Sequence, residues 1–297
     1  MSYLSFFNFE IAFWLNGGVQ IFFFISGYLY SMKKEMYDMN WFQKQLKKIV
    51  MPYLILLLIV LIADFICFNK TYSIKVLLQN ILCLQGFTYC IDELTHTWFI
   101  SYILLSYLIT PFLSEFDFNG ISELKFLIKI SFLSVFLLLL EVLGIVNIHI
   151  PYLLCYIWGF FFYSYYKEND YKFNKLIIIL LILFCLTLPI RLNVQYNLFD
   201  FFNLELFRNY SYITISINHN FLFILLFLIL LSLFDYIKIN SNNFLIFFDR
   251  YSYYIYLTHQ IFILNDFSLL NLTDSFSSYF FNFIKKNNEY CFKNRYF

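Results

Sequence analysis

The run VMPYLILLLIVLIADFIC, residues 50–67, is apolar apart from Asp64 and is long enough to form a membrane helix. A helix needs about twenty mainly apolar residues to cross the hydrocarbon core of a bilayer. Similar runs recur along the whole chain of 297 residues, of which 61% are hydrophobic and only 13% charged. A soluble domain of this length would not carry 42 Phe and 26 Tyr with so little charge to cover them. The sequence therefore predicts an integral membrane protein.

The apolar runs divide the chain into eight expected spans. Apolar residues are continuous within each run rather than alternating, which favours helices over strands. Residues 267–284 form a candidate ninth span, weakened by Asp274 and several serines. We therefore expect an all-α, polytopic transmembrane helical bundle that forms one domain over residues 1–297. The expected spans are residues 11–31, 50–67, 98–114, 127–147, 151–166, 176–190, 212–234 and 244–264.

Lysines and arginines set the expected orientation, because basic loops stay on the cytoplasmic side of a membrane. The loop 32–49 is rich in lysine and the loop 167–175 holds more, whereas the loops on the other side hold few basic residues. We expect residues 32–49 to face the cytoplasm and residues 68–97 to face outward. The first residues of the chain then lie outside.

With this topology several ionisable side chains lie in the outer part of the bilayer or just beyond it: Asp64, His96, Glu141, His219 and His259. Ionisable residues at membrane depth often line a wet cavity and mark function. The alternative for each one is an interfacial side chain that hydrogen-bonds a backbone carbonyl. The six cysteines have no metal-ligand spacing, so we expect no metal site, and nothing in the sequence indicates nucleic-acid binding.

Five blocks of sequence, taken in order, go further than composition. In this order and at these distances the chain resembles the integral-membrane acyltransferase family 3, polytopic O-acetyltransferases that act on bacterial surface sugars. The resemblance covers about residues 15–264 and leaves residues 265–297 as a divergent tail. The blocks are GGVQIFFFISGYLYS (17–31), FQKQLKKIVMPYL (42–54), HTWFISYILLSYLITPFL (96–113), IPYLLCYIWGFFF (150–162) and FDRYSYYIYLTHQIFI (248–263).

The resemblance implies a reaction in a bacterial cytoplasmic membrane, crossed several times by the chain. An acetyl or other short acyl group moves from acyl-CoA to a hydroxyl of a cell-surface or lipid-linked sugar. By resemblance, His259 and His96 are the catalytic candidates, since each falls in a family motif. The other implied or expected site residues are Ser252, Tyr256, Trp98 and Glu141 for the substrate, and Lys44, Lys47 and Lys48 for the phosphates of acetyl-CoA.

Two departures from the family pattern favour other readings. The family's first helix, with its arginine and histidine, has no counterpart here, and the family's Arg-x-x-Arg pair aligns with Gln45 and Lys48. One alternative is therefore a catalytically inactive fragment of such an enzyme. A transporter for polysaccharides or lipid-linked sugars is an alternative independent of these departures, since it would share the spans and the polar residues. The lysine cluster at 44–48 has its own alternative explanation, because positive-inside topology alone would place it there.

Overall fold

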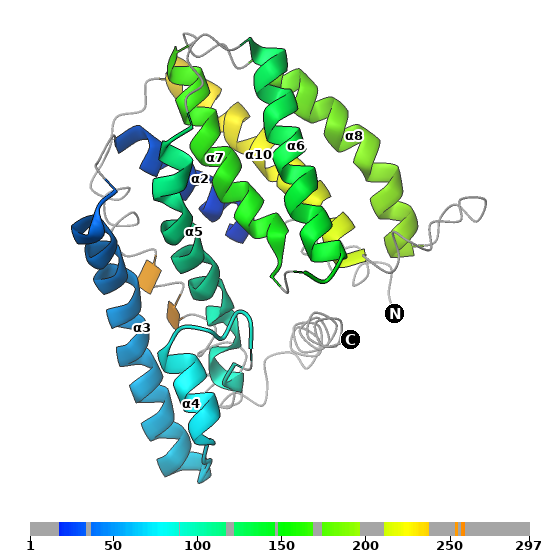
Figure 1. Ribbon diagram of the computed structural model, residues 1–297. Coiled ribbons are helices and arrows are strands. Elements are labelled where there is room, and N and C mark those ends of the chain that lie inside the picture. Colours follow the sequence, from blue (N-terminus) through cyan, green and yellow to red (C-terminus); the bar gives the residue numbers. More distant parts are fainter. Residues whose placement is uncertain are drawn as a thin grey trace. The chain divides into compact units, whose positions relative to one another are not determined.

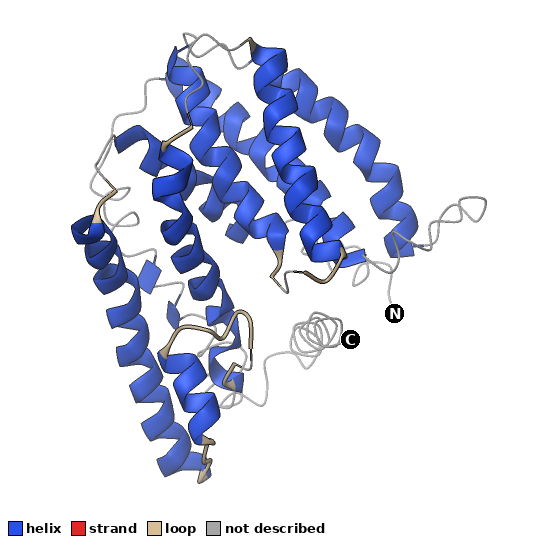
Figure 2. Ribbon diagram, viewed as in Figure 1, coloured by secondary structure: helices blue, strands red, loops and turns tan. Residues whose placement is uncertain are grey.

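The computed structural model describes residues 18–33, 37–88, 90–116, 122–145, 148–168, 174–196, 211–237, 253–254 and 257–258. Within these ranges nearly every residue is helical and no strand occurs (Figures 1 and 2), which confirms the all-α prediction. The helices are α2 (Gly18–Lys33), α3 (Met39–Phe68), α4 (Ile74–Ile81), the 3₁₀ helix η1 (Asp92–Thr97), α5 (Trp98–Ser114), α6 (Glu123–Val142), α7 (Ile150–Glu168), α8 (Asn174–Tyr196) and α10 (Ser211–Ile237).

Three described stretches are long and apolar enough to cross a bilayer: Met39–Cys67, Asp92–Ser114 and Ile213–Leu230. They correspond to the predicted spans 50–67, 98–114 and 212–234. Two shorter apolar helices, Gly18–Met32 and Ile177–Leu192, fall on two further predicted spans. The total of eight stays a prediction. The candidate ninth span and most of the predicted span 244–264 lie outside the described residues.

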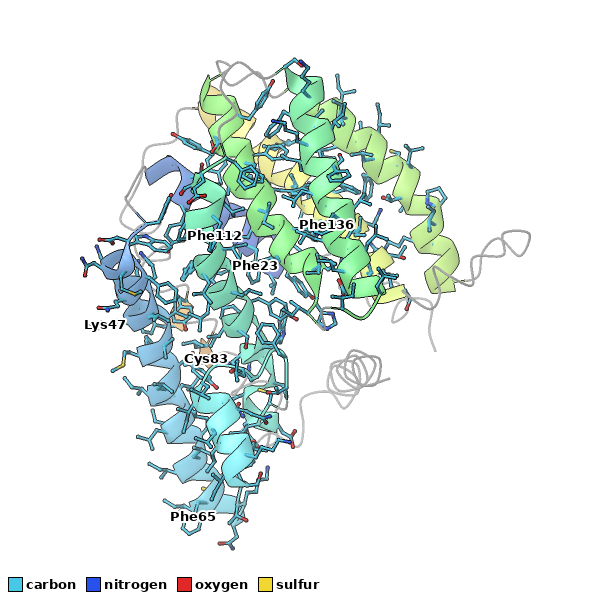
Figure 3. The ribbon with its side chains drawn as sticks, viewed as in Figure 1. Phe23, Lys47, Phe65, Cys83, Phe112 and Phe136 are labelled. Carbon is cyan, nitrogen blue, oxygen red and sulfur yellow. The ribbon has the colours of Figure 1, made fainter. Side chains whose placement is uncertain are left out.

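Large apolar side chains are exposed on the helices, as Figure 3 shows for Phe65, which points away from α3. Phe65 is 62% exposed and Phe136 is 51% exposed. Soluble monomers rarely expose large contiguous apolar surfaces, whereas helices in a bilayer present such side chains to lipid. The exposed phenylalanines therefore agree with a lipid bilayer as the surroundings of this protein.

The chain forms two compact units. The first contains Met1–Tyr37 and Leu108–Ile239, and the second contains Asp38–Tyr107 and Asn240–Phe297, so the boundary falls inside α5. In the first unit, α2 and α7 pack in parallel: Phe23 contacts Tyr152 near one end, and Ser31 Oγ lies 2.8 Å from Ser164 Oγ near the other.

Two glycines allow α2 and α7 to approach closely. A Cβ atom on Gly27 would lie 2.0 Å from the backbone oxygen of Tyr156, and one on Gly159 would lie 2.0 Å from the backbone oxygen of Phe24. Small residues at a helix interface let two backbones come together, which is how many membrane helices associate in the absence of a hydrophobic driving force. The α2–α7 pair is therefore a backbone-to-backbone contact that depends on both glycines.

Helix α6 runs antiparallel to α7 in the same unit. Phe126 near the start of α6 stacks on Tyr165 near the end of α7, with ring centroids 4.2 Å apart. Farther along, Trp158 Nε1 donates a hydrogen bond to Ser134 Oγ at 2.8 Å. The two helices therefore form a hairpin, whose connection includes the described residues 143–145 and 148–149.

In the second unit, α3 begins at an N-cap formed by Asp38, whose Oδ1 accepts from Trp41 N at 2.8 Å. The helix ends at Asn69, which has φ 50°, a left-handed conformation that asparagine tolerates better than most residues. The segment after α4 packs on the start of α5. There Gly86 N donates to Ser101 Oγ at 2.8 Å, and Ser101 Oγ donates to the backbone oxygen of Cys83 at 2.6 Å.

Candidate functional site

His96 lies buried at the end of η1, where it meets a segment 161 residues farther along the chain. Its Nε2 atom lies 2.8 Å from the backbone oxygen of Leu257. Leu257 stands two residues before His259 in the sequence. The structure thus brings the block that holds His96 to the block that holds His259, within the second unit.

Tyr253 anchors the same segment on two helices of that unit. Its hydroxyl donates to the backbone oxygen of Ile49 on α3 at 2.8 Å, and its ring packs against Phe99 on α5 with centroids 6.4 Å apart. The sequence-predicted residues Ser252, Tyr256 and His259 themselves lie outside the described residues.

The contact to Leu257 determines which nitrogen of His96 carries a hydrogen. A backbone oxygen can only accept, so Nε2 must donate. In the neutral ring the lone pair then belongs to Nδ1, which is the nitrogen able to take up a proton. The bond is of the kind that an interfacial histidine makes to a carbonyl. It therefore gives His96 a structural task and also fixes the tautomer that any proton transfer would use.

Trp98 begins α5 immediately after η1. Its ring meets Tyr102 edge-on, with centroids 5.6 Å apart. Gly86 lies against this turn, since a Cβ there would fall 2.5 Å from the backbone oxygen of Trp98. The His-x-Trp pair of the sequence is thus set in a closely packed junction between the 82–91 segment and α5.

A network of two carboxylates and a phenol lies beside η1. The Tyr72 hydroxyl lies 2.6 Å from Asp64 Oδ2 and 3.1 Å from Glu93 Oε2. Lys70 forms an ion pair with Glu93 through Oε1. Asp64 and Glu93 are both buried. These four side chains come from the end of α3, the α3–α4 connection and η1.

The Tyr72 hydroxyl is shared by two carboxyl groups. A phenol has one hydrogen, so Tyr72 can donate to only one of the two carboxylates when both are ionised. Burial raises the pKa of the Tyr72 hydroxyl, and the hydrogen bond to Asp64 and the charge of Glu93 raise it further. Tyr72 therefore stays protonated, and a further proton in the network would let the second carboxyl group donate to the phenol oxygen.

The lysines predicted to bind acetyl-CoA lie on the first turns of α3. Lys44, Lys47 and Lys48 stand at helical offsets of three and four, so they share one face, and all three are exposed. Figure 3 shows Lys47 on the outside of α3. Gln45 and Ile49 are buried on the opposite face. The structure thus gathers the three lysines in one exposed basic stripe.

Glu141, predicted to bind substrate, lies at the end of α6 in the first unit. Its Oε2 accepts from the backbone N–H of Ile150 at 3.0 Å, and its Oε1 lies 3.5 Å from His149 Nδ1. A carboxylate at the first turn of a helix satisfies a backbone donor and complements the helix dipole. Glu141 therefore closes the α6–α7 connection, and it lies in a different unit from His96.

In the first unit, a cluster of buried polar side chains joins α8 to α10. The Arg191 guanidinium donates from Nη1 to Asn218 Oδ1 at 3.0 Å, and Asn218 Nδ2 donates to Thr187 Oγ1 at 2.8 Å. Asn220 Nδ2 donates to the backbone oxygen of Pro151 on α7 at 2.8 Å. His219 is buried beside them against Phe223. These bonds hold three helices together through side chains rather than through apolar packing.

Sequence reasoning missed Tyr72 and Glu93. Both belong to the connection between two predicted spans, where no periodic pattern of apolar residues indicates the local structure. The signal that was available is spacing: Glu93 stands three residues before His96, in a segment where Asp92 and Glu93 are adjacent acids. Tyr72 had no signal, because its role depends on the fold of the α3–α4 connection.

Residues 1–284 match the model of a protein family that is described as an acyltransferase domain. No curated protein and no solved structure matches the chain.

Proposed function

Because this chain belongs to the acyltransferase 3 family, we propose that it transfers an acetyl group from acetyl-CoA to a sugar hydroxyl. The family and the long apolar helices make it a membrane acyltransferase. The identity of the acyl donor, the identity of the acceptor and the roles of the residues named below are proposals. The acceptor sugar belongs to the cell surface or to a lipid-linked precursor.

The reaction needs a base for the acceptor hydroxyl. As the base takes the proton, the hydroxyl oxygen attacks the thioester carbonyl, the carbon–sulfur bond breaks, and coenzyme A leaves as a thiolate that takes up the proton from the base. Imidazole suits this exchange because it titrates near neutral pH. We assign the base to His259, with His96 as the second histidine of the site.

One observation supports this location for the chemistry. His96 Nε2 and the backbone oxygen of Leu257, 2.8 Å apart, join the two sequence blocks in which the histidines stand. The two blocks are far apart in the sequence, so this contact depends on the tertiary fold. The Asp64–Tyr72–Glu93 network beside η1 adds further buried polar groups to the same unit.

The function is tested with the purified full chain in lipid vesicles. In the vesicles acetyl-CoA is supplied and the release of coenzyme A is measured. In a second experiment, O-acetyl esters are measured by NMR on envelope polysaccharide from cells that produce the protein. We expect release that depends on the polysaccharide, and near-complete loss of it in His259→Gln at unchanged thermal stability. An inactive wild-type chain contradicts the proposed function, and an active His259→Gln variant leaves His259 as a structural residue.

The donor site is tested through the basic stripe on α3. Replacing Lys44, Lys47 and Lys48 together by Gln removes three cations, each able to make a charge-assisted hydrogen bond to phosphate. We expect KM for acetyl-CoA to rise about tenfold or more, with KM for the acceptor unchanged. Lys75→Gln on α4 is the matched control, since Lys75 is another exposed lysine of the same unit. An unchanged KM in a stable triple variant would make the cluster a matter of topology alone.

A further inference from the structure

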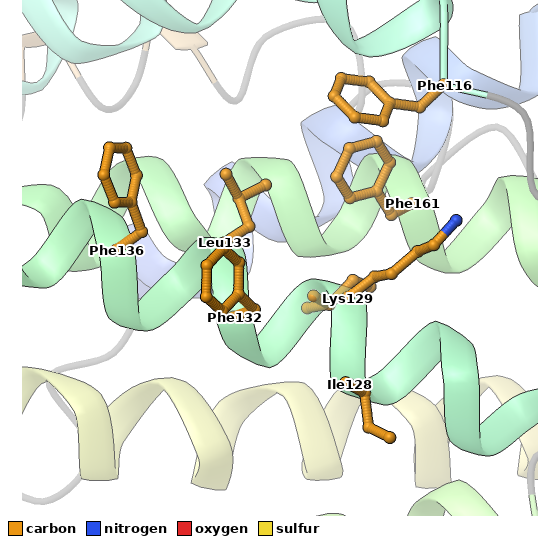
Figure 4. A pocket seen from close by; sticks show the side chains of 8 residues that line it. Phe116, Ile128, Lys129, Phe132, Leu133, Phe136 and Phe161 are labelled. Atoms are coloured by element: carbon orange, nitrogen blue, oxygen red, sulfur yellow. The ribbon is translucent and has the colours of Figure 1, made fainter.

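A groove of about 430 Å³ lies in the first unit, along α6 (Figure 4). Its volume falls in the range of about 300–1,000 Å³ that is typical of small-molecule sites. Apart from one lysine, its lining is aromatic and aliphatic. The lining residues are Phe116, Ile128, Lys129, Ile130, Phe132, Leu133, Phe136 and Phe161.

One face of α6 supplies the length of the groove. Lys129, Phe132, Leu133 and Phe136 stand at helical offsets of zero, three, four and seven, which places them in one row. At 1.5 Å per residue, the row from Lys129 to Phe136 is about 10 Å long. In Figure 4 the amine of Lys129 lies at the end of this row away from Phe136. The groove is thus an apolar strip with a cation at one end.

A pair of rings forms part of the facing wall. Phe116, which follows α5, meets Phe161 of α7 edge-on with centroids 5.5 Å apart. Phe132 itself is 74% exposed, so the strip is open along its side rather than enclosed. An open apolar strip at membrane depth accommodates a flexible hydrocarbon chain better than a compact polar ligand.

The charge at the end of the strip is available to a ligand. Among the described residues, no carboxylate oxygen lies within 4.0 Å of the Lys129 ammonium. Lys125 stands one turn earlier on the same face of α6 and is also exposed. Lys129 lies six residues into α6, about 9 Å from its first residue. From there a lysine side chain can reach the level of the lipid headgroups.

We propose that this groove binds one acyl chain of an anionic phospholipid, with the headgroup phosphate beside Lys129. The chain would lie along Phe132, Leu133 and Phe136, and the phosphate would complement the two lysines at the first turns of α6. A headgroup with a single phosphate and no cationic group is opposite in charge to this pair of lysines. The proposal does not depend on the proposed function, because it concerns a binding site that can be measured without turnover.

The test uses the purified full chain and phospholipids that carry a photoactivatable group in one acyl chain. Cross-linked peptides are mapped by mass spectrometry for phosphatidylglycerol and for phosphatidylcholine, which has the same chains and no net charge. We expect phosphatidylglycerol to label residues 128–136 about tenfold more than phosphatidylcholine, because the choline of phosphatidylcholine adds a cation beside Lys125 and Lys129 and cancels the charge of the phosphate. Lys129→Gln should remove that preference, and Lys75→Gln should leave it intact.

A second variant tests the strip itself. Leu133→Trp fills the groove without changing its charge, so labelling by both lipids should fall while thermal stability is kept. Equal labelling by the two lipids in the wild type, or a preference that survives Lys129→Gln, would overturn the proposal and leave the groove as ordinary lipid-facing surface. Competition by palmitoyl-CoA at lower concentration than phosphatidylglycerol would overturn it too, because the groove would then take the thioester donor.

Discussion

His96 holds the segment that contains Leu257 and, in the proposed function, also takes part in acetyl transfer; single substitutions can separate the two. The side-chain nitrogen of glutamine can reach the position of Nε2 and keep the bond to Leu257, but it cannot take up a proton at neutral pH. We predict that His96→Gln keeps thermal stability close to the wild type and loses most acetyl transfer. The measurements are the rate of coenzyme A release and the thermal unfolding of the same preparation.

The comparison variant is His96→Asn, whose amide reaches only to the position of Nδ1. It should lose the Leu257 bond and therefore stability as well as activity. If His96→Gln transfers acetyl groups at the wild-type rate, His96 serves only to hold the segment that contains Leu257.

Tyr72 gives a second prediction at this scale. Its hydroxyl contacts both Asp64 and Glu93, so Tyr72→Phe removes one hydrogen-bond donor from two buried carboxylates. Leaving buried polar groups unsatisfied costs about 1–3 kcal/mol. We predict a fall in thermal stability of that order, measured in detergent. Asp64→Asn added to Tyr72→Phe should restore part of it by removing one negative charge, and the absence of any restoration would contradict this account of the network.

At the level of helices, the α2–α7 contact depends on two residues without side chains. Gly27→Ala and Gly159→Ala each place a Cβ about 2.0 Å from a backbone oxygen, which cannot move away as a side chain could. Overpacking typically costs about 1–3 kcal/mol and more where backbone must shift. We predict lower yield and a lower unfolding temperature for each variant.

The same helix provides a control for that prediction. Gly18 also lies in α2, and a Cβ there would meet nothing within 4 Å. Gly18→Ala should be neutral or slightly stabilising, since alanine favours the helix. Equal loss in Gly18→Ala and Gly27→Ala would contradict this explanation, because only the Cβ at Gly27 would lie against the backbone of α7.

The helices that the sequence predicted are those with long apolar runs, such as α3, α5 and α10, because a run of that length has one outcome in a membrane. Helices α4 and η1 were not predicted. Both fall in the connection 68–97, where η1 has the polar sequence DELTHT, and its position depends on distant contacts such as His96 to Leu257. The sequence also placed Glu141 with His96 in one site; the two residues belong to different compact units, and their joint role stays a prediction. The roles of Lys44, Lys47 and Lys48 stay predictions.

At the scale of the whole molecule, orientation in the membrane is the feature to test. In the predicted topology the spans 11–31 and 151–166 both run inward, and this requires α2 and α7 to be parallel, as they are within the first unit. In a cysteine-free background, we predict that a cysteine at Lys34 is protected from an impermeant thiol reagent in intact cells. A cysteine at Lys75, exposed on α4, should react. Labelling at Lys34 in intact cells would reverse the orientation.

The bond between His96 and Leu257 also bears on how the protein is made. The two residues are 161 positions apart, and the whole of α6, α7, α8 and α10 is synthesised between them. At roughly 5–20 residues per second, a ribosome needs on the order of 10–30 s to reach Leu257 after it has produced His96. During that time η1 and the start of α5 wait in the nascent chain without their last partner. The second unit is therefore the later of the two to be completed. A ribosome that stops before residue 253 releases a chain in which the second unit has α3, α4 and η1 but lacks Leu257, the partner of His96.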